Sequence, residues 1–130
     1  KFVDEGEYVT CHWLPSENYQ GFFHILHGGI QATLIDEIAS WAIFSHEKTA
    51  GVTTEMNVKY RRAVRTDGGE IWLRAKVTDV SRRLVTAKVE LFNEKNELAT
   101  EADVVYMIYP EEVARQRLHW PGVDAFYKED

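Results

Sequence analysis

A glycine pair that opens a long apolar stretch constrains the fold of this chain more than any other feature. Residues 27–29 read His-Gly-Gly, and the largely apolar residues 30–44 that follow are interrupted by two acids, Asp36 and Glu37. Apolar side chains nearly all round a helix indicate that other structure surrounds it. The two glycines leave the backbone bare where the first helical N–H groups can face a negative charge. A carboxylate in such a helix is costly unless it is hydrogen-bonded, paired or hydrated, so Asp36 is a candidate functional residue.

Most of the remaining chain alternates with a period of two. Residues 8–14 predict a first strand, and the runs 52–60, 71–77, 85–91 and 98–109 predict four more, joined by short turns. We expect these four to form an antiparallel meander with the helix on one face, an α+β fold within one domain over residues 1–110. Residues 111–130 predict a short helix and an aromatic tail that packs on the domain or on a neighbouring subunit.

Composition narrows the class of function. With 130 residues and 45% hydrophobic content, the chain can form one core but not two ordinary domains. The formal net charge of -6 argues against nucleic-acid binding. A single cysteine, Cys11, excludes an internal disulfide and indicates a reducing, cytoplasmic location. No apolar run has the length of a membrane span, and residues 1–5 lack a signal-peptide core, so no membrane partner is expected.

The order of a strand, a Gly-Gly helix and four antiparallel strands resembles the hotdog fold, in which an antiparallel sheet wraps around a long central helix. His27-Gly28-Gly29 followed by Asp36 is similar to the signature of the acyl-CoA thioesterases related to the phenylacetate-pathway enzyme, the PaaI-like group. Residues 51–53, 56–60 and 81–84 extend this resemblance over roughly residues 9–108. It implies that a homodimer or homotetramer hydrolyses acyl-CoA. Relatives with this fold also bind acyl-CoA without hydrolysing it, so a non-catalytic binding module is the alternative.

Thioester hydrolysis needs donors for the carbonyl oxygen and a base or nucleophile on the other side of the carbon. The N–H groups of Gly28 and Gly29 suit the first role, and Asp36 suits the second, as a general base or as a nucleophile. The resemblance implies that the Thr53 hydroxyl orients the water, and its parity with residues 55 and 57 points it out of the subunit core. His27 either caps the helix or orients the thioester.

Gly29 and Asp36 are seven positions apart, or roughly 10 Å along a helix, which is too far for both to act on one carbonyl. We therefore expect Gly29 of one subunit to face Asp36 of another, and a monomer to be inactive. Glu37 is expected to form a structural hydrogen bond and is the reserve candidate for the role of Asp36.

For the coenzyme A moiety the resemblance points to two short segments, Tyr60-Arg61-Arg62 and Ser81-Arg82-Arg83. Guanidinium groups suit phosphates, although basic residues in exposed turns are often only solvated. Many relatives carry Asn or Gln six residues before the His of the motif, where this chain has Gly21, and this departure favours the binding-module alternative. The histidines and acids near the helix lack the spacing of a metal site, so neither a metal nor another cofactor is expected beyond the coenzyme A of the substrate.

Overall fold

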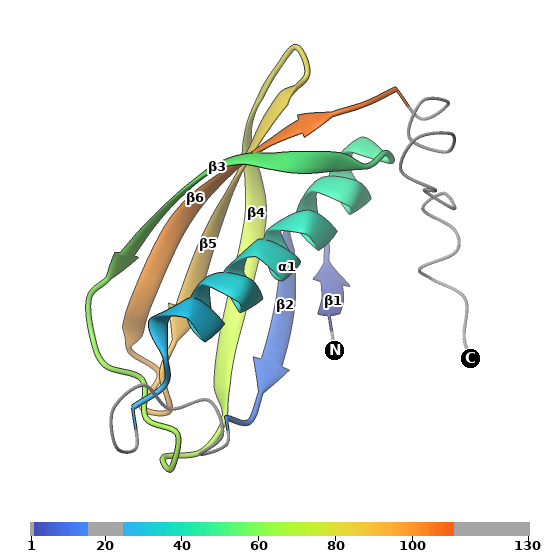
Figure 1. The fold of residues 1–130 in the computed structure, drawn as a ribbon. Helices are drawn as coiled ribbons and strands as arrows, with labels where there is room; N and C mark the ends of the chain where they lie inside the picture. Colours follow the sequence, from blue (N-terminus) through green and yellow to red (C-terminus); the bar gives the residue numbers. More distant parts are fainter. Residues whose placement is uncertain (1, 16–24, 111–130) are drawn as a thin grey trace.

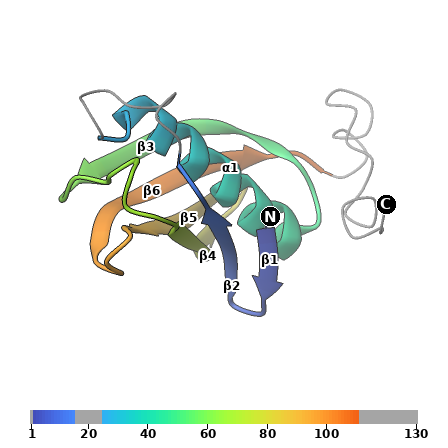
Figure 2. The same cartoon turned by 90° about the horizontal axis from the view of Figure 1, so that it is seen from below.

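The computed structural model of the chain describes residues 2–15 and 25–110. One helix, α1 (Gly28–Glu47), crosses the face of a sheet whose six strands in the described residues are all paired antiparallel, in the order β1-β2-β4-β5-β6-β3 (Figure 1). The strands are β1 (Phe2–Glu5), β2 (Tyr8–Trp13), β3 (Gly51–Tyr60), β4 (Ile71–Ser81), β5 (Leu84–Phe92) and β6 (Leu98–Ile108). Seen from below, the sheet curls around the helix (Figure 2). The predicted architecture, an antiparallel sheet wrapped around a long central helix, is confirmed.

The predicted four-strand meander is wrong in one connection. Strands β4, β5 and β6 are sequential neighbours, but β3 pairs with β6 at the sheet edge instead of with β4. Residues 61–70 carry the chain from β3 across the end of the sheet to β4, and the Leu26 N–H donates to the Val64 carbonyl along this path. Ten extended residues can span roughly 33 Å, more than the roughly 15 Å that separates strands three places apart. Alternation predicts which side chains face the core, but it does not predict strand order.

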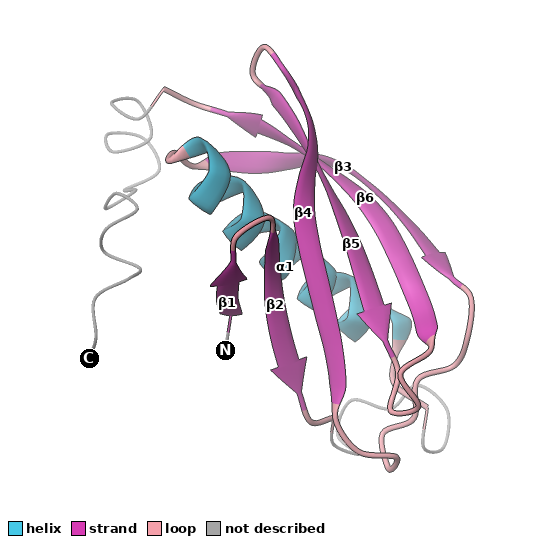
Figure 3. Cartoon of the chain, turned by 180° about the vertical axis from the view of Figure 1, so that it is seen from behind, coloured by secondary structure: helices cyan, strands magenta, loops and turns pink. Residues whose placement is uncertain are grey.

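The core lies between one stripe of α1 and the inner face of the sheet. The helix buries residues spaced by three and four, and the strands contribute small and β-branched residues such as Ala75, Val89 and Val104. The opposite view shows the strands from their outer face, with α1 behind them (Figure 3). The helix is not buried all round in the single chain, because a second set of its apolar residues is only partly buried: Ile30, Leu34, Trp41 and Phe44.

A β-bulge in β3 changes the side-chain pattern of this strand. Thr53 pairs with Tyr106, and pairing resumes at residue 55, so Thr54 is an extra residue between the two registers. Met56 then pairs with Val104. Directly opposed residues share a face, and both Tyr106 and Val104 are buried, so Thr53 lies on the same face as Met56. The prediction that Thr53 points out of the subunit core with residues 55 and 57 is wrong, because strict alternation makes no allowance for the extra residue.

Candidate active site

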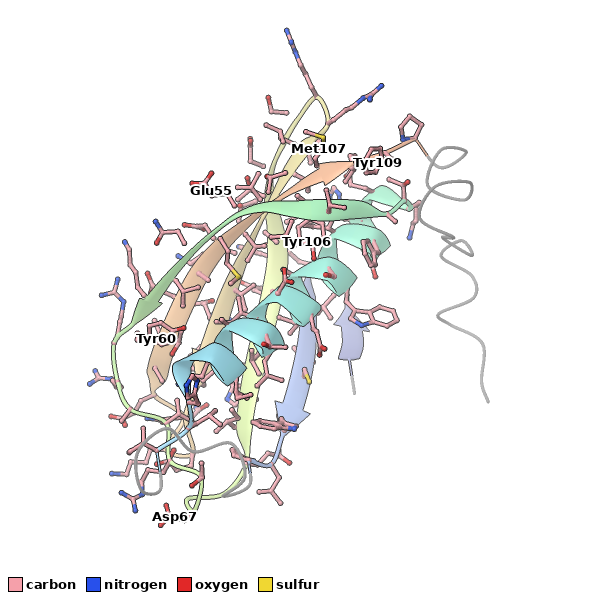
Figure 4. The ribbon with its side chains drawn as sticks, viewed as in Figure 1. Glu55, Tyr60, Asp67, Tyr106, Met107 and Tyr109 are labelled. Carbon is pink, nitrogen blue, oxygen red and sulfur yellow. The ribbon has the colours of Figure 1, made fainter. Side chains whose placement is uncertain are left out.

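The Asp36 carboxylate is held between α1 and the β3–β6 pair. The Thr53 hydroxyl donates a hydrogen bond to Asp36 Oδ1 over 2.7 Å, and the Tyr106 hydroxyl donates to the same oxygen over 3.3 Å. Ser40 donates to the Asp36 carbonyl over 2.9 Å and also contacts the Tyr106 hydroxyl. Asp36 is half-buried and Thr53 is exposed, while Tyr106 lies behind the helix on the sheet (Figure 4). The carboxylate is therefore fixed on one side and open to solvent on the other.

The phenol of Tyr106 stays protonated beside this carboxylate. Burial raises the pKa of Tyr106 above its usual value, and the Asp36 charge raises it further, while hydrogen bonds with Ser40 and Thr53 act in the opposite direction. A neutral phenol is a donor, so Tyr106 can hydrogen-bond the Asp36 carboxylate. Sequence reasoning missed Tyr106 and Ser40. Two features of the sequence could have indicated them. Tyr106 is a tyrosine at a core position of a strand, and its hydroxyl needs a hydrogen-bond partner. Ser40 is a serine one helical turn after Asp36.

The helix begins with His27 as its N-cap. His27 Nδ1 accepts the Gly29 N–H over 2.8 Å, and its carbonyl accepts from the N–H groups of Ile30 and Gln31. The capping interpretation of His27 is confirmed, and the Gly29 N–H is occupied by it. No residue in ranges 2–15 and 25–110 accepts from the Gly28 N–H. Of the two predicted oxyanion donors, the Gly28 N–H is the one without a described acceptor.

Tyr60, at the far end of β3, lies against the helix start. Its hydroxyl donates to the Gly28 carbonyl over 2.8 Å, and a Cβ on Gly28 would lie 3.3 Å from the Tyr60 ring. Figure 4 shows Tyr60 reaching toward the first turn of α1. The close approach explains why residue 28 has no side chain, since even a methyl group would press on the ring.

A groove of about 620 Å³ opens beside this helix start. Its walls include Gly28 and Gln31 on the helix and the segment from Tyr60 to Ala63. Arg61 pairs with Glu101 over 3.1 Å, a hydrogen bond that holds the pKa of Glu101 below its usual value. Arg62 is exposed and has no ion pair with any described residue. The groove thus combines an apolar surface with a guanidinium that is available to an anion.

The second predicted basic segment lies at the other end of the sheet. Ser81 ends β4, and Arg82 and Arg83 form the exposed turn to β5, which projects far from Tyr60 (Figures 1 and 4). The turn neighbours Met107 of β6, whereas Tyr60 pairs with Thr100. Seven strand residues span roughly 24 Å. The structure therefore brings residues 27, 28 and 60–62 together and Asp36 with Thr53, but within one chain it separates residues 81–83 from the group around Gly28 and Tyr60.

Other expectations concern single residues. The Glu37 side chain is exposed and forms no hydrogen bond with any described residue, so the predicted structural hydrogen bond is not observed within the described part of one subunit. Gly21 and the tail 111–130 lie outside the described residues. Where side chains are described, no group of three or more His, Cys, Asp or Glu is arranged to hold a metal ion. The described helix is not long and apolar enough to cross a membrane.

Comparison with known proteins places this geometry in a family. The model of the thioesterase superfamily matches residues 23–100, more than half of the chain. The chain belongs to the thioesterase superfamily. Mouse acyl-coenzyme A thioesterase 13 is 33% identical over 88 residues, which are 67% of this chain and 62% of the mouse protein. The human protein of the same name is 33% identical over 86 residues, 65% of this chain and 61% of the human one. The chain thus spans about three-fifths of the length of these relatives.

Solved structures extend this likeness to the fold of the superfamily. Thioesterase superfamily member 2 from zebrafish has a TM-score of 0.73 at 28% identity, covering 82% of this chain and 80% of its own. The mouse protein of the same name gives the same TM-score and identity, covering 82% and 79%. The predicted hotdog fold is confirmed, and so is the resemblance to thioesterases at the level of the superfamily.

Proposed function

We propose that this protein hydrolyses acyl-CoA thioesters to free acid and coenzyme A, as a member of the phenylacetate-type group within the superfamily. The observation that carries the proposal is the Asp36 carboxylate, fixed by Thr53 and open to solvent on the wall of the central helix. The 33% identity with proteins named acyl-coenzyme A thioesterase supports the substrate class. The exposed Arg62 beside the groove supports the binding of a phosphate-bearing substrate.

The site is completed by a second copy of the chain. Asp36 lies about 12 Å along the helix from Gly28, too far for both to reach one carbonyl. Strand β3 lies at the sheet edge, and most of its residues are exposed. If two copies pair antiparallel through β3, the start of one strand lies beside the end of the other. Asp36 and Thr53 of one subunit then lie near Gly28 and Tyr60 of the partner subunit.

The same pairing resolves the separation of the two basic segments. The β4–β5 turn lies at the end of the sheet where β3 begins, and Arg61 and Arg62 lie where β3 ends. Antiparallel pairing brings Arg82 and Arg83 of one subunit to the side of Arg61 and Arg62 of the other. Both segments can then contact the phosphates of one coenzyme A, whose acyl end enters the groove between subunits. Catalysis and substrate binding would both depend on the oligomer.

In the proposed mechanism, the Gly28 N–H donates to the thioester oxygen and Asp36 acts from the partner subunit. Asp36 removes a proton from water as the water oxygen attacks the carbonyl carbon, and the C–S bond breaks when the tetrahedral intermediate collapses. The sulfur leaves with the electron pair of that bond and takes the proton from Asp36. Thr53 occupies Oδ1 and so directs the other carboxylate oxygen to the water. Direct attack by Asp36 to give an anhydride is the variant of this mechanism. In a single turnover in ¹⁸O-labelled water, label found in Asp36 would identify this variant, with water attacking the Asp36 carbonyl of the anhydride.

One observation favours the second candidate, a binding module without catalysis. The Gly29 N–H donates to His27 and is not available to a thioester oxygen while this cap is formed. An oxyanion site with one backbone donor would stabilise the transition state less well. This alternative predicts tight acyl-CoA binding without turnover, unchanged by Asp36→Ala.

The deciding experiment is free-thiol release from aromatic, short, medium and long acyl-CoAs by wild type and Asp36→Ala, at the same verified oligomeric state. We expect wild-type turnover on at least one acyl-CoA and a loss of about a hundredfold or more in the variant, equivalent to roughly 2.7 kcal/mol of barrier. If wild type binds acyl-CoA without hydrolysing it, the protein is a binding module and not an enzyme. Turnover that does not depend on Asp36 would move the chemistry to Glu37 or His27.

A further inference from the structure

Gln31 is a buried polar side chain at the start of a helix that is otherwise anchored by apolar residues. It is 4% exposed, belongs to the buried stripe of α1 and lines the groove beside Gly28. A residue three positions after Gly28 lies on the same side of the helix, and helical side chains lean back toward the N-terminus. The Gln31 amide is therefore directed to the region of the groove that the Gly28 N–H also faces. Burying an amide costs free energy unless its polar atoms are used, so its presence needs an explanation.

One half of this amide is held by the sheet. Thr100 of β6 is fully buried, and its hydroxyl donates to Gln31 Oε1 over 2.6 Å. If the oxygen and nitrogen of the Gln31 amide were exchanged, the Thr100 hydroxyl would have to accept a hydrogen bond from the nitrogen. The hydroxyl proton of Thr100 would then lose Gln31 Oε1, its acceptor among the described residues. The carbonyl oxygen of Gln31 therefore faces Thr100, which leaves the NH₂ group on the side of the groove. None of the described residues accepts a hydrogen bond from this Gln31 nitrogen.

We propose that Gln31 Nε2 is the second donor to the thioester oxygen, beside the Gly28 N–H, and that Thr100 is the residue that positions it. The inference rests on the proposed thioesterase function. It gives Gln31 the role of second oxyanion donor that Gly29 does not fill, because the Gly29 N–H donates to His27. A donor fixed before the substrate arrives needs no reorganisation as charge develops on the oxygen, which is the property that makes such donors effective. The groove and the buried hydrogen bond give Gln31 this fixed geometry.

The test compares variants at position 31 in the intact oligomer. Gln31→Met keeps the length of the side chain and removes the donor, and Gln31→Glu keeps its shape and places an acceptor there. We expect kcat for acyl-CoA hydrolysis to fall about a hundredfold in Gln31→Met, the scale of loss of one oxyanion donor. Gln31→Glu should lose at least as much, because a carboxylate repels the developing charge. KM and the inhibition constant of free coenzyme A, which has no carbonyl at its sulfur, should stay within about threefold of wild type, or about 0.7 kcal/mol.

Variants of Thr100 test the positioning role. Thr100→Val removes the hydroxyl at nearly constant shape. It should lower kcat by about tenfold and leave the inhibition constant of coenzyme A unchanged. Thr100→Ser restores the hydroxyl and should restore kcat. The matched control is Thr66→Val, which also replaces a buried threonine, but one whose hydroxyl has no hydrogen-bond partner in the described part of the chain. It should leave kcat unchanged.

The outcomes separate this inference from the function on which it rests. If wild type hydrolyses acyl-CoA, Asp36→Ala does not, and both Gln31 variants retain kcat, the role of Gln31 is overturned and the thioesterase function stands. A rise in KM and in the coenzyme A inhibition constant at constant kcat would also overturn it, since Gln31 would then bind the coenzyme and not the reacting carbonyl. If wild type hydrolyses no acyl-CoA, both proposals fail. Thermal unfolding of each variant identifies any loss of kcat that comes from misfolding. Gln31→Glu has the same shape as the wild-type side chain, so a loss of kcat in this variant is not due to altered packing at position 31.

Discussion

The coupling between Thr53 and Asp36 is the most direct quantitative test of the site. Thr53→Val removes the hydroxyl that donates to Asp36 Oδ1 over 2.7 Å and keeps the branched shape. A hydrogen bond to a charged group contributes about 1.5–3 kcal/mol, and Thr53 is exposed, so the lower end applies. We therefore expect kcat to fall by about tenfold, or roughly 1.4 kcal/mol of barrier. Asp36→Asn, which removes the base, should cost about a hundredfold or more, roughly 2.7 kcal/mol.

The double variant distinguishes the mechanism. If Thr53 acts only by fixing Asp36, then Thr53→Val added to Asp36→Asn changes nothing further, and the two losses are not multiplied. Free-thiol release measured for wild type, both single variants and the double variant completes the cycle, with Thr53→Ser as the control that keeps the hydroxyl. Independent action would give a combined loss of about a thousandfold, or roughly 4 kcal/mol, and that result would refute the inference that Thr53 works through Asp36.

Three further predictions concern stability. An added Cβ at Gly51 would lie 2.2 Å from the Met107 carbonyl oxygen, so Gly51→Ala must part β3 from β6 at that end. Losing about two backbone hydrogen bonds at roughly 1 kcal/mol each should lower the free energy of unfolding in urea by about 2 kcal/mol, and an unchanged value would contradict the close approach. Because the pKa of Tyr106 is raised above its usual 10.0, the unfolded state loses this proton first, and the free energy of unfolding should fall as pH rises above about 10. Tyr106→Phe should flatten that decline in urea unfolding at several pH values. Thr66→Val removes a buried hydroxyl without a described partner and should raise the free energy of unfolding by about 1 kcal/mol in the same assay.

The sequence predicts the central helix and the core-facing residues well because both depend on local periodicity. Helix α1 runs from Gly28 to Glu47, where the glycine pair and the fading apolar pattern place its ends to within a few residues. The role of His27 as a cap is also local, since its ring reaches only to Gly29. Such features are determined by neighbours in the chain, and the pattern of one sequence contains them.

Features that depend on pairing between distant segments were predicted less well. Strand order places β3 beside β6, and this choice depends on packing of the whole sheet. The bulge at Thr54 is similar: nothing in the alternation of residues 51–60 marks one residue as extra. The amide of Gln31 was overlooked for the same reason, because its meaning comes from Thr100, sixty-nine positions away. A polar residue in an apolar helix stripe was the available signal.

The bulge also explains how one strand can serve both parts of the site. Without an extra residue, the face that carries Tyr60 would carry Thr54 and not Thr53, and the hydroxyl of Thr53 would point away from the helix. With it, β3 presents Tyr60 to Gly28 at one end and Thr53 to Asp36 at the other. Because both contacts are made by the same strand, the distance between the Gly28 N–H and the Asp36 carboxylate is fixed within one chain and cannot shorten. In the proposed mechanism the two parts meet across a two-fold axis that reverses the strand, and we therefore expect a lone subunit to be inactive.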